Sequence, residues 1–213
     1  MAAVFADTNV LFPFSIMDLL LALSEDRLHT SLWTDALLDE WEDVIVREQQ
    51  RTPDTAASLT AAVKEFFAAD KIERAEYEHL ISAMPGKDPD DHEHMAAAVA
   101  RQPCTLLTNN RDDFPSKHLR QRGVRVLDPD AYLCELIDEW PDEVIATVVR
   151  VAQEKRHPPR TSADQLGLLE RAGVPKFTAK VRRALAAGRS RAVAPAGRAA
   201  ATAATDPDTE DHP

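Results

Sequence analysis

Short apolar runs alternate along this 213-residue chain with stretches of helically spaced apolar residues. The runs stop at polar or turn-forming residues after a few positions, which is typical of buried strands. Between the runs, apolar residues recur every three or four positions, as at Ile16, Leu19 and Leu23, which predicts helices. The predicted strands are residues 2–6, 29–32, 104–108 and 124–127.

Helix-start signals locate several of the intervening helices. Pro13 is suited to open the first helix, Thr34 is suited to cap the next, and Asp88 is suited to cap another that begins at Pro89. Further helical stretches are predicted over residues 55–69 and 72–83, and as one helix over about 129–153.

The resulting order is β-α-β-α-α-α-α-β-α-β-α. Strands separated by helices predict a three-layer α/β fold, with a mainly parallel central sheet flanked by helices. Ligands of such sheets sit beyond the carboxyl ends of the strands. Asp7 follows the first predicted strand and residues 108–113 follow the third, so we expect these segments to meet at one edge.

The composition changes after Gln153. Residues 155–160 combine basic residues with two prolines and predict a linker, and residues 162–186 regain apolar positions. From Ala187 the apolar period is lost, which predicts disorder. We therefore expect a main domain over residues 1–153, a small basic helical extension over 154–186 and a disordered tail over 187–213.

No membrane or secretion signal is predicted. The longest apolar run, residues 16–23, contains Asp18 and is too short to cross a bilayer, and the first residues lack the basic start of a secretory signal. Cys104 and Cys134 have no metal-site spacing and are expected to be reduced thiols. These features favour a cytoplasmic protein.

The net charge of −11 is unevenly distributed. Residues 1–153 carry a net charge of −15, whereas residues 154–198 carry +8. An acidic body argues against loose binding of nucleic acid, but a basic extension can offset it. The cations Lys176, Lys180, Arg182 and Arg183 are therefore candidates for contact with an RNA backbone, the alternative being a solvated helix face.

Carboxylates gather at four places along the main domain. Each group has a simpler explanation, such as a turn, a helix cap or a solvated face. Together in one pocket, however, they would repel one another unless a cation neutralised them, and oxygen ligands suit Mg²⁺ or Mn²⁺. The four groups are Asp7, residues 39–40, residues 88–91 and residues 112–113.

These motifs, in this order, resemble those of PIN-domain ribonucleases, in particular the VapC-type toxins of toxin–antitoxin systems. The resemblance spans about residues 1–135, from VFADTNVL at residues 4–11, through LLDE at 37–40 and DPDDHEHMAAA at 88–98, to LLTNNRDDFP at 106–115 and VLDPDAYL at 126–133. It implies the PIN-like version of the predicted fold.

Position by position, the resemblance implies that Asp7, Glu40, Asp91 and Asp113 are the catalytic, metal-binding carboxylates. Asn9, Asp88, Thr108 and Asn110 would support them through hydrogen bonds or bound water. Many family members have Asp where this chain has Asn110, which removes one negative charge from the site. Asp112 is the alternative to Asp113.

The implied activity is endonucleolytic hydrolysis of RNA with Mg²⁺ or Mn²⁺, which leaves 5′-phosphate and 3′-hydroxyl ends. The implied partners are an RNA substrate such as transfer RNA, a cognate antitoxin protein that blocks the acidic cleft, and a second copy of the chain in a homodimer.

Two histidines accompany Asp91 on its predicted helix. His92 and His94 are two residues apart and therefore point roughly 200° apart, so they cannot both face one ion. By the resemblance, His92 is the one that contacts the site.

Three other functions compete with this interpretation. A haloacid-dehalogenase-like phosphatase also places Asp after the first strand, but it needs a second Asp where this chain has Asn9. A catalytically silent PIN-like scaffold is favoured only by Asn110. A PIN nuclease of RNA processing, outside a toxin system, has the same residues.

Overall fold

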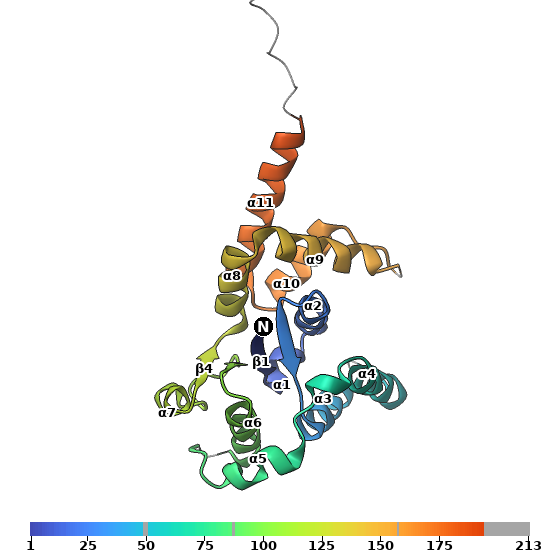
Figure 1. The fold of residues 1–213 in the computed structure, drawn as a ribbon. Helices are drawn as coiled ribbons and strands as arrows, with labels where there is room; N and C mark the ends of the chain where they lie inside the picture. The colour runs from blue at the N-terminus through green and yellow to red at the C-terminus, as the bar shows by residue number, and fades with distance from the viewer. Residues whose placement is uncertain (49–50, 87, 157, 194–213) are drawn as a thin grey trace, which may run out of the picture.

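The computed structural model describes residues 1–48, 51–86, 88–156 and 158–193 as an α/β fold (Figure 1). Its strands are β1 (Ala2–Ala6), β2 (His29–Leu32), β3 (Cys104–Leu107) and β4 (Val124–Leu127). Its helices are α1 (Thr8–Leu11), α2 (Phe14–Glu25), α3 (Asp35–Arg47), α4 (Pro53–Phe66), the short 3₁₀ helix η1 (Ala68–Asp70), α5 (Arg74–Ile81), α6 (Pro89–Ala100), α7 (Ser116–Gln121), α8 (Pro129–Glu139), α9 (Pro141–Glu154), α10 (Ser162–Arg171) and α11 (Pro175–Val193).

The four strands form one parallel sheet in the order β2-β1-β3-β4. β1 lies at its centre, where Phe5 pairs with Leu32 on one side and Leu106 on the other. This arrangement confirms the predicted fold class. It also brings the residues that follow β1 and β3 to the same edge, because the paired strands run in the same direction.

Helices cover both faces of the sheet, and alternate residues of β1 pack against the helices of opposite faces. Phe5 belongs to a hydrophobic cluster with residues of α3, α5, α6 and α7, whereas Val4 and Ala6 belong to a second cluster with α2, α8, α9, α10 and α11. Successive strand residues point to opposite faces, so a run of apolar residues fills both layers.

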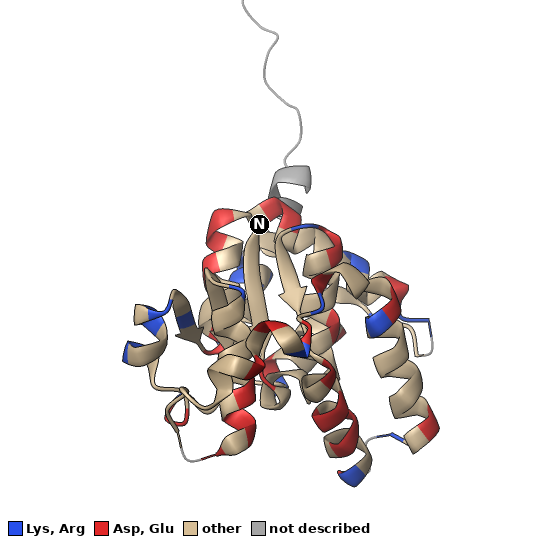
Figure 2. Cartoon of the chain, turned by 60° about the horizontal axis from the view of Figure 1, so that its bottom comes forward, with Lys and Arg blue, Asp and Glu red and all other residues tan. Residues whose placement is uncertain are grey.

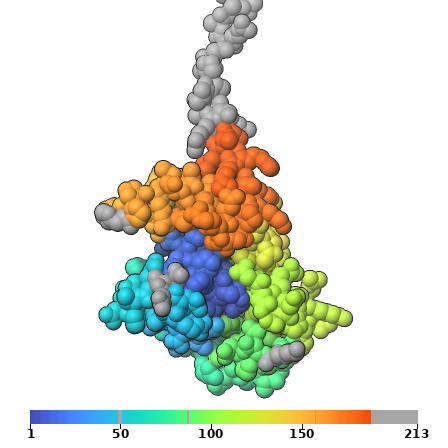
Figure 3. Space-filling view, turned by 180° about the vertical axis from the view of Figure 1, so that it is seen from behind, coloured from blue at the N-terminus to red at the C-terminus, as the bar shows by residue number. Residues whose placement is uncertain are grey.

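Helices α10 and α11 pack directly onto the sheet domain. Leu166, Phe177 and Val181 are buried in the same cluster as Leu133 of α8 and Val148 of α9. In Figure 3 the segment from about residue 150 onward lies closely on the N-terminal part of the chain. The division at residue 153 stays a prediction, but the helices after it share the core of the helices before it.

One predicted helix is wrong. The predicted helix over 129–153 is two helices, because Pro141 starts a new one after Trp140, whose backbone is non-helical at φ −130° and ψ 63°. The disordered tail expected over 187–213 stays a prediction, and α11 extends to Val193. Alanine supports helix even without an apolar period, once the preceding turns are anchored. The rest of the predicted tail, residues 194–213, lies outside the described residues.

None of the described helices is long and apolar enough to cross a membrane. Cys104 and Cys134 are free thiols.

Asp130 joins the first turn of α8 to the start of α11. Its carboxylate, nearly fully buried, accepts hydrogen bonds from the backbone N–H groups of Lys176 at 3.1 Å and Phe177 at 2.8 Å. The first N–H groups of a helix have no partner within it, so this contact satisfies two of them and favours the dipole.

We predict that Asp130→Ala lowers the free energy of unfolding by about 1–2 kcal/mol, the usual cost of losing a helix cap, or more because the site is buried. Urea unfolding followed by circular dichroism measures it. Asp138→Ala, which removes an exposed partner of Lys180 on the same helix, is the matched control and should cost less. Equal stabilities of the two variants would contradict the cap.

His29 forms a second buried polar link, between β2, α2 and α8. Its Nε2 lies 3.0 Å from the Leu20 carbonyl oxygen, and its Nδ1 lies 2.9 Å from the Tyr132 hydroxyl. A neutral imidazole satisfies both contacts by donating from Nε2 and accepting at Nδ1. Burial lowers the pKa of His29 to about 4, against a smaller opposing effect of the Leu20 carbonyl.

We predict a loss of stability as the pH falls from about 6.5 to about 4, because the unfolded chain protonates His29 in this window and the folded chain does not. Above this window the contribution is complete. Thermal unfolding of the wild type and His29→Gln across the window isolates it, since carboxylate effects are common to both. Parallel pH profiles would rule out this role.

Candidate functional site

The candidate site begins where β1 ends. Asp7 follows Ala6 directly, and its backbone N–H donates to the Leu107 carbonyl at 2.9 Å, which continues the pairing of β1 with β3. Although Asp7 precedes α1, its side chain does not cap that helix. The buried carboxylate is therefore free to take partners from other segments.

Residues that follow β1 and β3 hold this carboxylate in place. The Thr108 hydroxyl donates to Asp7 Oδ2 at 2.9 Å, and the Asn9 amide donates to the same oxygen. Asn9 is itself fixed by Asn109, whose backbone N–H donates to Asn9 Oδ1 at 2.9 Å. The expected supporting positions of Asn9 and Thr108 are thus in contact with Asp7, and Asn109 joins them as a residue that the sequence did not single out.

Helix α6 supplies Asp91 and His94. As predicted, Asp88 is its N-cap, where the carboxylate accepts the Asp90 N–H at 3.1 Å, and Pro89 is its first residue. Asp91 and His94 are three residues apart and so share a face of this helix. That face turns toward the end of β1.

Asp7, Asp88, Asp91 and Asp113, which we call the acidic cluster, act on one another electrostatically. The pKa of Asp91 is raised to about 6, first by partial burial and then by the charges of Asp7, Asp88 and Asp113. A carboxylate resists ionisation when its neighbours are anions.

Asn110 and Asp113 form a local pair after β3. The Asn110 amide donates a hydrogen bond to Asp113 Oδ2, and the Asn110 backbone N–H donates to the Thr108 hydroxyl at 3.0 Å. Asn110 thus adds no negative charge to the site, but its amide orients the side chain of Asp113. Asp113 and its alternative, Asp112, are both exposed.

His94 lies between two carboxylates. Its Nδ1 is 3.2 Å from Asp7 Oδ1, and its Nε2 is 3.2 Å from Oε2 of Glu40 on α3. Burial alone would lower the pKa of His94, but the contacts with Asp7 and Glu40 outweigh it and raise this pKa to about 9. The two carboxylates therefore favour the protonated form of the buried imidazole.

His94, which the resemblance did not single out, contacts Asp7, and the contact of His92 with the site stays a prediction. The helical spacing is enough to predict the side on which His94 lies, since a residue three positions after Asp91 shares its face of the helix. The ring of His92 lies near Gly86, where a Cβ atom would meet His92 Nε2 at 3.3 Å.

The chemistry of the donors fits a divalent cation. Hard cations prefer oxygen ligands, and a positive ion would relieve the repulsion that raises the pKa of Asp91. Within the described residues, however, no three acidic, histidine or cysteine side chains are arranged as a metal site. Asp7 and Asp113 are occupied with hydrogen bonds from Asn9, Thr108 and Asn110.

Acidic residues dominate the surface around this edge. In Figure 2, with the lower side of the molecule brought forward, Asp and Glu colour several elements around the middle of the view, and Lys and Arg are sparser there. A polyanion would need compensating positive charge to approach such a face.

The basic residues of α11 are partly neutralised. Lys180 pairs with Asp138 of α8, and Arg182 pairs with Glu170 of α10. No ion pair involves the side chains of Lys176 and Arg183 in the part of the chain that the structure describes. The expected RNA contact of all four stays a prediction.

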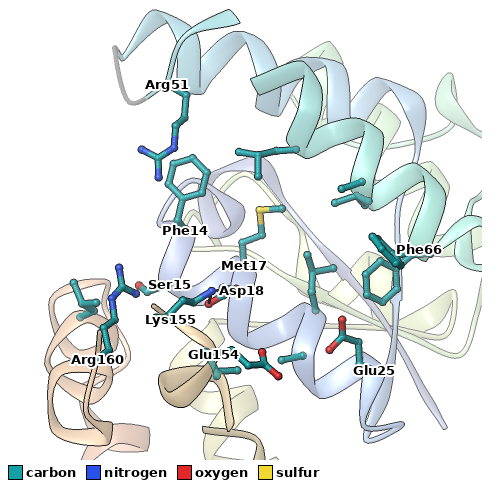
Figure 4. Close-up of a pocket in the computed structure, with 18 of the residues that line it drawn as sticks. Phe14, Ser15, Met17, Asp18, Glu25, Arg51, Phe66, Glu154, Lys155 and Arg160 are labelled. Atoms are coloured by element: carbon teal, nitrogen blue, oxygen red, sulfur yellow. Dashed lines mark hydrogen bonds and ion pairs between the residues drawn. The ribbon is translucent and has the colours of Figure 1, made fainter. Parts of the chain in front are cut away.

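A hollow of about 580 Å³ lies elsewhere, between α2, α4, α9 and α10. Figure 4 shows Phe14 and Met17 in its wall, with Phe66 at one end. The Arg51 guanidinium lies over the Phe14 ring, 4.2 Å from its centroid, and Lys155 pairs with Asp18 at 2.8 Å. No residue of the acidic cluster lines this hollow, so the two features are separate.

Comparisons with known proteins add two matches. The family model described as the VapC50 C-terminal domain matches residues 129–183, a range that crosses the expected boundary at residue 153. A protein of Mycobacterium tuberculosis named "Putative ribonuclease VapC50" is 31% identical over 112 residues, which cover 53% of this chain and 65% of that protein. The chain thus matches just under two thirds of the relative's length. No solved structure gives a significant match.

Proposed function

On the premise that this chain is a member of the VapC-type family, which both matches support, we propose that it is a metal-dependent endoribonuclease. The observation that carries the proposal is the acidic cluster, which stands at the carboxyl edge of a parallel sheet with one aspartate at a raised pKa. Active sites of such sheets occupy this edge.

In this proposal the four carboxylates of Asp7, Glu40, Asp91 and Asp113 would hold Mg²⁺ or Mn²⁺. A bound divalent ion would offset the charge of the phosphate and lower the pKa of a water molecule. Thr108 and Asn9 hold Asp7 in place, and Asn110 holds Asp113. Asp88 caps α6 and so fixes the first turn, from which Asp91 projects.

We further propose that the chain acts as a toxin on an RNA such as transfer RNA, that it forms a homodimer, and that a cognate antitoxin protein inhibits it. The support is the family of the two matches. A role in RNA processing uses the same chemistry, and the presence of a small antitoxin gene beside the coding sequence would favour the toxin.

We predict that the purified chain cleaves RNA with Mg²⁺ or Mn²⁺, that EDTA abolishes cleavage, and that Asp7→Asn lowers the rate on the order of 100-fold or more. Asp39→Asn is the matched control, because it removes the same charge from an exposed residue that pairs with Lys64. Gel analysis of end-labelled RNA measures the rate and identifies 5′-phosphate ends.

Two outcomes would count against the proposal. Equal loss in Asp7→Asn and Asp39→Asn would place the effect outside the acidic cluster. No cleavage by a folded wild type, free of a bound inhibitor, would favour a silent scaffold, in which the neutral Asn110 is the residue to restore to Asp.

The ion pairs of α11 distinguish paired from unpaired cations and so provide a matched test of RNA contact. We predict that replacing Lys176 and Arg183 by Gln weakens RNA binding and flattens its salt dependence, because each phosphate contact contributes to the slope. Replacing Lys180 and Arg182, whose charges are already paired, should change the slope less. Filter binding at several salt concentrations compares the two pairs, and identical slopes for both variants and the wild type would exclude α11 from the interface.

A further inference from the structure

Glu40 stands apart from the acidic cluster. Its Oε2 contacts His94 Nε2, whereas Asp7 Oδ1 contacts the other ring nitrogen, Nδ1, each at 3.2 Å. The imidazole therefore lies between the two carboxylates. The side chains of Asp7 and His94 are buried, at 6% and 4% exposed, whereas that of Glu40 is 37% exposed.

We infer that Glu40 acts as a positioning residue, which orients His94 against Asp7, and that it is not a ligand of the cation. This inference rests on the proposed metal-dependent function and reassigns one of the four carboxylates. The ligands would then come from the acidic cluster alone. Glu40 and His94 would act as one unit behind Asp7.

The first support is how Asp7 is held. Its Oδ2 accepts hydrogen bonds from Thr108 and Asn9, and its Oδ1 faces His94. The hydroxyl and the amide fix the Oδ2 side, and the imidazole lies beside Oδ1. Because Oδ2 already accepts two hydrogen bonds, Oδ1 is the oxygen left available to an ion.

The second support is the side from which Glu40 approaches. Asp7 and Glu40 face different nitrogens of the His94 ring, so the imidazole lies between Glu40 and Asp7.

The third support is chemical. A buried imidazole whose ring is fixed at one nitrogen by a carboxylate presents its other nitrogen in a fixed direction, as outer partners of metal sites do. Glu40 supplies that restraint from α3, and Thr34, which caps α3 by accepting the Leu37 N–H at 3.0 Å, fixes the start of the helix. His94 transmits the restraint to the end of β1.

A double-mutant cycle on Mn²⁺ affinity tests the inference. We predict that Glu40→Gln and His94→Gln each weaken Mn²⁺ binding to the full chain by about 10-fold, the size of outer-shell effects, and that the double variant loses about 10-fold rather than about 100-fold. Electron paramagnetic resonance of free Mn²⁺ measures the affinity without RNA or turnover.

A control separates this effect from general charge or packing changes. Asp39→Asn, one residue before Glu40, should leave the affinity within about twofold of the wild type. Circular dichroism checks that each variant is folded. Independent losses that multiply in the double variant would overturn the inference and make Glu40 a ligand.

A measurement that leaves His94 in place covers the case in which His94→Gln does not fold. We predict that Glu40→Gln changes the ¹⁵N chemical shifts of the His94 ring in the metal-free chain and that Asp39→Asn does not. Unchanged shifts in Glu40→Gln would overturn the inference.

Failure of the inference and failure of the proposed function give different results. If the wild type binds Mn²⁺ and cleaves RNA but the two losses multiply, only the role of Glu40 is wrong. If the folded wild type neither binds Mn²⁺ nor cleaves RNA, the proposed function fails, and the inference fails with it.

Discussion

The parallel pairing of β1 with β3 fixes the position of everything in the site. The backbone N–H of Asp7 continues that pairing to Leu107, so the carboxylate lies beside the Thr108 hydroxyl although the two residues are far apart in the sequence. Helix α6 packs against both strands and adds Asp91 and His94 from the side. A shift in register would separate Asp7 from its partners while leaving each motif intact, so the chemistry depends on the sheet.

The sequence predicted the four strands, the parallel sheet and the meeting of Asp7 with Thr108, because strand ends and helix caps leave local signals. It placed Asp88 correctly as a cap. It did not predict the contact of His94 with Asp7 and Glu40, which depends on the angle between α3 and α6. The break at Pro141 was also missed, although proline excludes the preceding residue from helical geometry and is a local signal.

The charges of the C-terminal helices show a second property that the sequence alone does not predict. Their excess of Lys and Arg is plain in the composition, but the ion pairs of Lys180 with Asp138 and of Arg182 with Glu170 arise from helix packing. A net charge summed along the sequence therefore overstates the charge available to a polyanion. The same packing places Phe177 and Val181 in the core that lies under β1.

That shared core has a consequence for synthesis on the ribosome. The hydrophobic cluster that contains Val4 and Ala6 also contains Phe177 and Val181 of α11, so it stays incomplete until residues near Val181 have left the exit tunnel. The strands that position the acidic cluster are translated before α11 but share a core with it. A nascent chain would therefore reach its folded state only after residues near Val181 have been translated, which delays any activity of the site until then.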